Sequence, residues 1–409
     1  MRFALYHPWV YLKGGAERVI TELVGRSRHE WTVYTHRFQP DTTFPQLSGM
    51  SVVELEPRVS VRRSAAPLAR AALAMGSARL PLDECDALLV SSEGLGDLVL
   101  SRATVPAACF CHTPLKILHD PATRSRLSRS HPAKAIAARA VAPAFRRADR
   151  RLWRRYRHVL ANSSETRGRI AAGGLAEADE VEVLHPGVDC DMFHPGRETR
   201  QPFFLAAGRI MWQKNLALAI DAVDAARQQG VRAGLVIAGA MDEKSRPYLA
   251  ELRRRAQGLP VAFEVDPDDA RMADLYRRAL ACLVTAPNED FGIVPLEAMA
   301  SGTPVIAVDA GGPRETVVHG RTGWLVPGRP GAFAVRMAEV AEAGDDMAPM
   351  RNAARRRALD FRWDRFVDRV DEVMEAVAKG GRPPPPVRRP EILLGDSAGQ
   401  QVDVLERAN

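Results

Sequence analysis

The sequence predicts an α/β fold with two doubly wound parallel-sheet domains that face one another across a cleft. Three observations support this prediction. Short apolar runs alternate with amphipathic stretches of helical period, this alternation occurs twice along the chain, and 409 residues are enough for two hydrophobic cores. Strands that alternate with helices indicate parallel sheets covered by helices on both faces.

The first series of strands occupies the N-terminal half of the chain. Helical patterns lie between some of the strands, as at residues 17–24 and 166–172. Together they predict a first domain over residues 1–190. The expected strands are short apolar runs at residues 3–6, 31–35, 52–55, 87–90, 107–111, 159–161 and 181–184.

The second series begins after residues 185–202, a segment with several prolines and glycines and little periodicity. Helices are expected at residues 216–229 and 269–279, and a second domain over residues 191–362. The six expected strands are at residues 203–207, 235–238, 261–264, 281–285, 304–307 and 324–326.

The end of the chain has a different character. From Gly380 onward the chain contains a run of four prolines and then mostly polar residues. We expect residues 380–409 to be a disordered tail.

Composition restricts the class of protein. Apolar residues make up 46% and charged residues 26% of the chain, which is typical of soluble globular proteins and excludes a disordered, collagen-like or disulfide-stabilised chain. No apolar stretch reaches the ~18 uncharged residues of a membrane span, and the N-terminus shows no signal-peptide pattern. The five cysteines are irregularly spaced, so we expect reduced thiols and a cytoplasmic protein.

The net charge of +7 favours anionic ligands such as phosphates or acidic lipids. Only six of the 57 basic residues are Lys, and this skew towards Arg weakens an argument from charge to nucleic acid. Carboxylates at the candidate site described below argue further against nucleic acid, because they repel its backbone.

Two segments after predicted first-domain strands could carry chemistry. After the first strand, Gly14 and Gly15 let the backbone approach a ligand, and the helix that follows offers free N–H groups to a phosphate or a sugar hydroxyl. The alternative is an ordinary strand–helix turn. Further along, His112 stands at the carboxyl end of a strand, beside the proposed cleft. A structural histidine is the alternative there.

The second domain repeats this arrangement. Arg209 and Lys214 follow its first strand and precede a helix. Arg presents a planar fork to a phosphate and Lys a mobile point charge, so the two predict an anion site. Two ordinary surface residues are the alternative.

The richest segment runs from residue 288 to residue 302. Glu289 lies on a loop and Glu297 in the helix that follows, while the backbone of residues 291–293 offers N–H groups at the helix start. Two spaced carboxylates suit a ligand with many hydroxyl groups. They could instead serve as helix caps. Gly311 and Gly312 form another strand–helix turn at the same edge of the sheet.

These segments together resemble the family-four retaining glycosyltransferases of GT-B fold, which are also called glycosyl transferases group 1. The resemblance covers roughly residues 1–375, and its most specific part is Glu289 followed after seven residues by Glu297. The matching blocks, in order, are Gly14-Gly15-Ala16-Glu17, His112-Thr113-Pro114, Asn162-Ser163, Pro186-Gly187-Val188-Asp189, Gly208-Arg209 with Lys214, Glu289 with Glu297, Gly302-Thr303-Pro304-Val305, Gly311-Gly312, and Gly320 with Thr322-Gly323. Residues 111–116 are also similar to a subgroup of bacterial polysaccharide mannosyltransferases.

The resemblance implies two Rossmann-like domains and a nucleotide-diphosphate sugar as donor. Arg209 and Lys214 would bind the diphosphate, and Glu297 would accept hydrogen bonds from the ribose hydroxyls. Glu289 would hold the donor sugar, together with the backbone of Phe291, Gly292 and Ile293.

The resemblance also implies roles for the first domain. His112 would line the reaction centre, and Gly15 would approach the donor or the acceptor. Residues 363–379 would form a helix that crosses back to the first domain.

The sequence departs from the family pattern in two places. Residues 263–267 replace a glycine that the family often carries, which leaves the contacts to the base open, and the bulky pair Met211-Trp212 follows Arg209. Two Asp-x-Asp segments, at residues 189–191 and 266–268, mimic a metal-binding motif that GT-B enzymes generally do not need. We therefore predict no metal and no cofactor besides the nucleotide sugar.

Residues 124–157 hold eleven Arg and one Lys against a single acid, Asp149. Phe145, Leu152 and Tyr156, with Ala148, share one face of a predicted helix over residues 144–157. Such a helix can lie on an anionic membrane, which would place the protein at the inner face of the plasma membrane. A solvated or acceptor-facing helix is the alternative.

The expected function is transfer of a hexose, from GDP-mannose or a UDP-sugar, to a hydroxyl acceptor that could be lipid-linked, with retention of the anomeric configuration. Such a reaction belongs to the synthesis of polysaccharides, other glycans, glycolipids or glycosylated metabolites. Two alternatives stay open: a GT-B-like sugar-nucleotide epimerase, and a protein that binds sugar nucleotides without catalysis.

Overall fold

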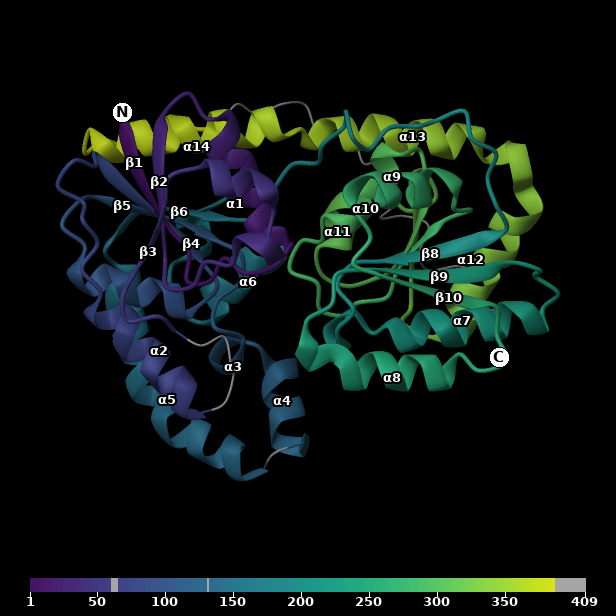
Figure 1. Cartoon of the computed structure of the whole chain (residues 1–409), viewed down its shortest axis with the longest axis horizontal. Coiled ribbons are helices and arrows are strands. Elements are labelled where there is room, and N and C mark those ends of the chain that lie inside the picture. Colours follow the sequence, from purple (N-terminus) through teal and green to yellow (C-terminus); the bar gives the residue numbers. More distant parts are fainter. Residues whose placement is uncertain (60–64, 131, 387–409) are drawn as a thin grey trace.

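A computed structural model of the chain describes residues 1–59, 65–130 and 132–386. Figure 1 shows two α/β bodies side by side, with the C-terminal helices running along both. Most of the predicted disordered tail, from residue 387 onward, lies outside the described residues. No helix in the described ranges has the length and apolar character needed to cross a membrane.

The first body contains a seven-stranded sheet in the order β3-β2-β1-β4-β5-β6-β7, with every neighbouring pair parallel. Each strand lies where an apolar run was predicted. The strands are β1 (Arg2–Tyr6), β2 (Glu30–Thr35), β3 (Val52–Glu54), β4 (Ala87–Ser92), β5 (Ala107–Cys111), β6 (Tyr156–Ala161) and β7 (Val181–Val183).

Helices connect these strands, because parallel neighbours need a crossover segment. Those of the first body are α1 (Gly15–Arg26), α2 (Ala65–Ser77), α3 (Lys116–His119), α4 (Pro121–Ser130), α5 (Pro132–Trp153) and α6 (Ser164–Ala172), with short 3₁₀ turns η1 (Pro40–Thr42), η2 (Pro45–Gly49), η3 (Leu95–Arg102) and η4 (Ala178–Glu180).

The second body contains a six-stranded parallel sheet in the order β10-β9-β8-β11-β12-β13. Here too each strand overlaps an expected one. The strands are β8 (Phe203–Ala207), β9 (Gly234–Gly239), β10 (Val261–Val265), β11 (Cys282–Val284), β12 (Val305–Val308) and β13 (Gly323–Val326).

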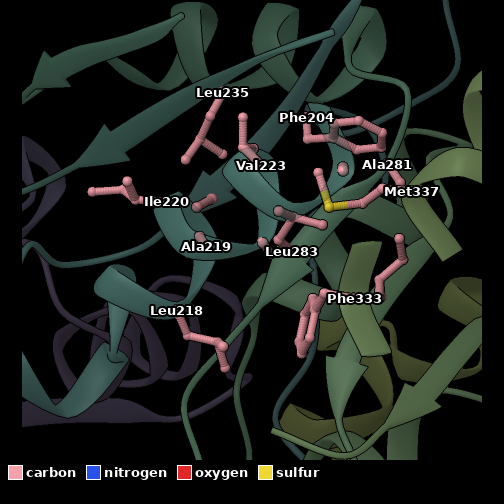
Figure 2. Close-up of a cluster of buried hydrophobic side chains, with 14 of the residues drawn as sticks. Phe204, Leu218, Ala219, Ile220, Val223, Leu235, Ala281, Leu283, Phe333 and Met337 are labelled. Atoms are coloured by element: carbon pink, nitrogen blue, oxygen red, sulfur yellow. The ribbon is translucent and has the colours of Figure 1, made fainter. Parts of the chain in front are cut away.

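The helices of this body cover both faces of its sheet. On one face, Phe204 and Leu235 of the strands pack with Val223 of α7 and with Phe333 and Met337 of α12 (Figure 2). The helices are α7 (Leu216–Gln228), α8 (Arg246–Arg255), α9 (Asp269–Arg278), α10 (Val294–Ala300), α11 (Pro313–Thr316), α12 (Pro330–Ala343) and α13 (Ala348–Ala358), with 3₁₀ turns η5 (Trp212–Lys214), η6 (Glu243–Ser245), η7 (Gly344–Met347) and η8 (Leu359–Phe361).

The last helix, α14 (Trp363–Ala378), follows the second body in sequence but packs on the first (Figure 1). Its buried residues recur at helical spacing, and the Phe366 ring lies 5.1 Å from the Phe110 ring of β5. Gly187, in the segment between the bodies, allows this crossing, because a Cβ there would lie 2.5 Å from the Trp363 nitrogen. Within residues 132–386 the chain therefore crosses between the bodies twice, before β8 and before α14.

Both sheets change winding direction at one place, between β1 and β4 in the first and between β8 and β11 in the second. Ligands of open parallel sheets bind beyond the carboxyl ends of the strands at such a switch point. Arg209 and Lys214 follow β8, Glu289 follows β11, and His112 follows β5, the neighbour of β4 in the first sheet. The topology thus gathers residues that are far apart in the sequence.

Candidate active site

A pocket opens at the carboxyl ends of β8 and β11 in the second body. Lys214, Glu289 and Gly292 are among the residues that line it, together with residues of β11 and the first residues of α10. Because these residues come from two loops at the switch point of the sheet, the pocket is the natural place for a ligand of this domain.

The central contact of this pocket is an ion pair. The Nζ atom of Lys214 lies 2.7 Å from Oε2 of Glu289. Burial alone would raise the pKa of Glu289, but the positive charges of Lys214, Lys116 and Arg209 hold it below its usual value. Glu289 is therefore ionised at neutral pH, and the pair presents a cation and an anion side by side.

Arg209 lies beside this pair and keeps its guanidinium available. It follows Gly208, whose φ of +117° is accessible to glycine. The side chain is half-buried and makes no hydrogen bond or ion pair within the described ranges of the chain. Its charge helps to hold down the pKa of Glu289 in the second body, and it opposes the rise that burial causes in the pKa of Glu17 in the first. Arg209 therefore lies where it can act on both sides of the interface.

Two glycine-rich loops pack against each other beneath Glu289. The Gly312 nitrogen donates to the Glu289 carbonyl at 3.1 Å, and a Cβ on Gly312 would lie 2.1 Å from the Phe291 carbonyl. Gly292 has a φ of +84° and Gly311 a φ of +63°, conformations that favour glycine. The predicted glycines thus fix the loop that carries Glu289.

The residues on either side of Gly292 anchor this loop. The Phe291 ring is buried and stacks on His185 at 5.3 Å between ring centres. Ile293 packs in the cores of both bodies, and its Cδ1 would lie 3.9 Å from a Cβ placed on Gly15. The structure therefore brings Gly15 and Ile293 together across the interface.

Glu297 lies in the first turn of α10 and has a different partner. Its Oε2 accepts the hydroxyl of Tyr276 at 2.7 Å. Burial raises its pKa, and the hydrogen bond from Tyr276 works in the opposite direction. Helix α10 has no side-chain cap, so the alternative in which these glutamates cap that helix does not describe the structure.

On the first body, His112 stands beyond the end of β5 within a buried network. Its Nε2 lies 2.8 Å from the hydroxyl oxygen of Ser91, and that oxygen lies 3.0 Å from Nδ1 of His7. Burial lowers the pKa of His112 to about 4 and also lowers that of His7. Both imidazoles are therefore neutral at pH 7, and each can exchange hydrogen bonds with a hydroxyl group.

Helix α1 brings a buried carboxyl group to the same region. Gly14 is its N-cap and Glu17 lies in its first turn, only 5% exposed. Burial, and then the negative charge of Glu93, raise the pKa of Glu17 to about 8, although Arg209 opposes this. Glu17 is thus mainly protonated at pH 7. Its position was singled out in the sequence, but its protonation state depends on surroundings that no local pattern reveals.

Sequence reasoning missed the polar contacts between the bodies. Asp290 pairs with Lys116, with 2.6 Å between Oδ2 and Nζ, and also with Arg169. A second contact joins Arg18 to Asp269 at 3.2 Å. Asp290 lies within the segment highlighted by sequence, but its partners are 174 and 121 residues away. Lys116 ends the run 111–116 noted above, yet nothing local pairs it with Asp290, and Arg169 shows no local signal.

A third interbody contact involves Glu315 of α11. Its two carboxylate oxygens accept hydrogen bonds from the Ser164 and Glu165 backbone nitrogens, at 2.9 and 3.3 Å, at the start of α6. It also pairs with His185 at 2.8 Å. Glu315 thus caps a helix of the other body, a role that follows from tertiary structure alone.

The basic segment 124–157 requires a correction. The expected helix over residues 144–157 ends at Trp153, and Tyr156 begins strand β6. Phe145 and Leu152 pack on the core of the first body, and the buried Tyr156 hydroxyl donates to Asp97 at 2.5 Å. Much of the apolar stripe therefore faces the protein interior, although Arg side chains and Ile136 remain exposed.

The two Asp-x-Asp segments do not assemble a metal centre with their neighbours. Within the described part of the chain, no three His, Cys, Asp or Glu side chains gather in a way that could hold a metal ion. Asp189 instead accepts backbone hydrogen bonds from residues 191 and 192, and Asp268 caps α9.

Two family models match the chain in tandem. The model described as Glycosyltransferase Family 4 matches residues 13–192, and the model described as Glycosyl transferases group 1 matches residues 189–357.

Curated relatives are similar over different lengths. A D-inositol 3-phosphate glycosyltransferase of Streptomyces avermitilis is 32% identical over 55% of this chain and 53% of its own length, so the chain spans about half of that relative. The protein of the same description from Kribbella flavida is 32% identical over 76% of this chain and 80% of its own length. An alpha-1,3/1,6-mannosyltransferase alg-2 of Neurospora crassa is 30% identical over 54% of this chain and 56% of its own length.

Solved structures share the fold over nearly the whole chain. Anabaena HepE in complex with UDP and glucose has a TM-score of 0.69 at 20% identity, covering 92% of this chain and 99% of that one. Sucrose-phosphate synthase from Thermosynechococcus elongatus has a TM-score of 0.70 at 17% identity, covering 93% and 100%. At these sequence identities the similarity shows a shared fold and nothing about the reaction.

Proposed function

The chain belongs to the family 4 glycosyltransferases of GT-B fold, and from that premise we propose that it moves a hexose from a nucleotide-diphosphate sugar to a hydroxyl acceptor with retention of configuration. The observation that carries this proposal is the cluster of Arg209, Lys214 and Glu289 at the switch point of the second sheet. It combines cations for a diphosphate with a carboxylate for sugar hydroxyls.

The donor is proposed to be GDP-mannose or a UDP-sugar. A mannosyltransferase is among the relatives, and the structure of HepE contains UDP and glucose. In this donor, Arg209 and Lys214 take the diphosphate, since Arg offers a planar fork and Lys a point charge. Glu297 takes the ribose hydroxyls and Glu289 the sugar.

Backbone N–H groups complete the proposed donor site. Those of Phe291, Gly292 and Ile293 precede helix α10, where the positive end of the helix dipole and unpaired N–H groups favour oxygen ligands. The tight packing of Gly311 and Gly312 supports this loop from behind. The sugar and the leaving phosphate of the donor would therefore meet backbone N–H groups that are already in place to donate hydrogen bonds.

In the proposed reaction the acceptor hydroxyl attacks the anomeric carbon from the face that the diphosphate leaves. The new bond joins the acceptor oxygen to that carbon, the bond from carbon to phosphate oxygen breaks, and the acceptor proton passes to the departing phosphate. Arg209 and Lys214 stabilise the charge on that phosphate, so we propose that no metal is needed. His112, being neutral, is suited to hold a hydroxyl group at the reaction centre.

The acceptor is proposed to carry a free hydroxyl on a sugar, a cyclitol or a lipid-linked glycan, in the synthesis of polysaccharides or related glycoconjugates. The named relatives include D-inositol 3-phosphate glycosyltransferases. The exposed Arg side chains of α4 and α5 would allow peripheral contact with anionic lipid at the inner face of the plasma membrane, each contributing on the order of 1 kcal/mol near such a surface. Flotation with acidic vesicles at low salt tests that contact, and no flotation would reject it.

A donor panel tests the function as a whole. Purified protein is heated with UDP-glucose, UDP-galactose, UDP-N-acetylglucosamine, GDP-mannose, UDP and GDP, because a ligand at one hundred times its Kd stabilises by about 2.7 kcal/mol. The stabilising donor is then incubated with hydroxyl acceptors, with and without EDTA, and the product anomer is assigned by NMR. We expect transfer with retention in both conditions.

Other outcomes of the panel would point to the rivals. An altered free sugar nucleotide without an acceptor would favour the epimerase. Stabilisation without turnover on a wide acceptor panel would favour a non-catalytic binding protein. Loss of transfer in EDTA, restored by added divalent cation, would overturn the metal-free mechanism.

A further inference from the structure

We propose that Asp290 is a positioning residue through which the first body sets the place of Glu289 in the second. This inference rests on the proposed role of Glu289 in holding the donor sugar. It concerns the link between the two bodies and adds no new contact to the donor.

Both carboxylate oxygens of Asp290 form ion pairs with residues of the first body. Lys116 of α3 lies 2.6 Å from Oδ2, and Arg169 of α6 pairs with Oδ1. The Asp290 carbonyl also accepts the hydroxyl of Ser163 at 2.5 Å. Three residues of the first body therefore hold one residue of the second, with charge-assisted bonds among the strongest that side chains form.

The residue before Glu289 is held by the same body. Asn288 accepts from Arg169 and donates to Asp120, with 3.2 Å between Nδ2 and Oδ2. Asp120 is itself fixed, since its Oδ2 accepts both the backbone nitrogen and the hydroxyl of Thr123. The first body thus binds the loop at residues 288 and 290, which stand immediately before and after Glu289.

Glu289 itself turns to the second body. Its side chain reaches Lys214 at 2.7 Å, and its carbonyl accepts from Gly312. The side chains of residues 288, 289 and 290 therefore alternate between the two bodies. Because only three consecutive residues are involved, a change in the grip on Asp290 moves the backbone that carries Glu289. The position of Glu289 consequently depends on the interface between the bodies.

The test uses Asp290→Asn, which removes the charge and keeps the size, and Lys116→Met, which removes one partner. Arg169 is left in place, because it also contacts Asn288 and Glu165. Asp221→Asn is the matched control, since Asp221 pairs with Arg255 at 2.5 and 2.7 Å on the outer surface of the second body. Lys116→Arg is the conservative rescue.

Four quantities are measured for each full-length variant. They are the Kd of UDP and of GDP by calorimetry, kcat and KM with the donor found in the panel, amide exchange of a peptide spanning residues 286–296, and Tm. For Asp290→Asn we expect an unchanged nucleotide Kd, a lowered Tm because two ion pairs lose their anion, faster exchange in the peptide, and a kcat lowered by about tenfold. Lys116→Met should behave alike, whereas Lys116→Arg and Asp221→Asn should match the wild type.

The double variant Lys116→Met with Asp290→Asn decides whether the two residues act together. A coupled pair predicts that the double variant loses no more kcat than Asp290→Asn alone. The proposal would be overturned if the double variant lost kcat by the product of the two single losses. It would also be overturned if Asp290→Asn kept the wild-type kcat and exchange rate, or if its loss of nucleotide affinity equalled its loss of kcat. If wild-type protein binds neither UDP nor GDP and transfers nothing, the proposed function fails, while unchanged exchange in Asp290→Asn would still refute the grip separately.

Discussion

The two bodies offer chemically different faces to the candidate site. On the second body, the functional side chains are charged and paired, as in Lys214 with Glu289 at 2.7 Å. On the first body, they are buried and mainly uncharged at pH 7, because burial lowers the pKa of His112 to about 4 and raises that of Glu17 to about 8. Among the candidate site residues, charge thus lies on the second body and neutral hydrogen-bonding groups lie on the first, although Lys116 and Arg169 of the first body carry charge where the two bodies meet.

This difference indicates where each part of a donor would belong. A diphosphate needs cations, which the second body supplies. An attacking hydroxyl instead needs a neutral group that can accept a hydrogen bond from its O–H. Arg209 is the exception that joins the two, because its charge acts on Glu17 and on Glu289. Four predictions test whether the division holds.

The largest effect is expected from removing the cation of the charged face. Lys214→Ala should weaken binding of UDP or GDP and of the intact donor by about 3 kcal/mol, or roughly a hundredfold, since a charge-assisted bond is lost and Glu289 is left unpaired. Thermal unfolding should change much less. Calorimetry on the variant checks this, with the exposed Lys379→Ala as a control. An unchanged nucleotide affinity would contradict the assignment of Lys214.

The next effect separates the two glutamates of the same face. Glu297→Gln should weaken free nucleotide and intact donor alike, because both contain ribose. Glu289→Gln should leave the free nucleotide unaffected and lower turnover, because only the donor carries the sugar. Each loss should be about 1–3 kcal/mol. Calorimetry with nucleotide and donor, alongside turnover, gives the comparison, and a Glu289→Gln variant that loses nucleotide affinity to the same extent would reject the division of roles.

A third prediction concerns the buried carboxyl of the first body. The folded pKa of Glu17 is about 8, above the reference of 4.5, so the folded state binds the extra proton and stability falls as pH rises between these values. Glu17→Gln removes that loss, so its stability relative to the wild type should rise by about 2–2.5 kcal/mol between pH 5 and pH 7. Chemical unfolding at the two pH values measures it, with exposed Glu342→Gln as control. A gain that does not grow with pH would show that Glu17 is ionised in the folded protein.

The smallest effect comes from the neutral imidazole. The folded pKa of His112 is about 4 against a reference of 6.5, so the unfolded state binds more protons in this window and stability falls as the solution is acidified. The free energy of unfolding should therefore fall by about 1 kcal/mol less in His112→Gln than in the wild type when the pH is lowered from 7 to 5.5. The exposed His194→Gln should not. Identical acid profiles for wild type and His112→Gln would argue that His112 is already charged in the fold.

The sequence predicted those parts of the site that depend on local patterns, and it did not predict contacts between residues far apart in the chain. Lys214 and Glu289 were both expected in loops after strands of one sheet, and the switch point between β8 and β11 brings those loops together. Their direct ion pair was not expected, because a strand–loop pattern gives the edge on which a residue lies and not the atom that it meets. Arg169 carried no signal at all, since its role arises from partners more than one hundred residues away.

The segment around Tyr156 shows the opposite case, in which a correct periodicity gave a wrong element. Phe145, Leu152 and Tyr156 fit one face of a helix, but the chain leaves the helix at Trp153 and Tyr156 enters β6. Pairing with β5 and a buried hydrogen bond to Asp97 outweigh the local preference. Helical spacing therefore located an inward face but not the end of the element.

By itself the sequence determined the strands that the described residues form, their division into two sheets and the loops that carry the chemistry, because apolar periodicity and glycine placement are local properties of a chain. Tertiary structure alone decided the protonation of Glu17 and His112 and the grip of Lys116 and Arg169 on Asp290. The physical reason is that desolvation and ion pairing depend on which distant groups share a small volume, and only the packing of the two bodies determines that.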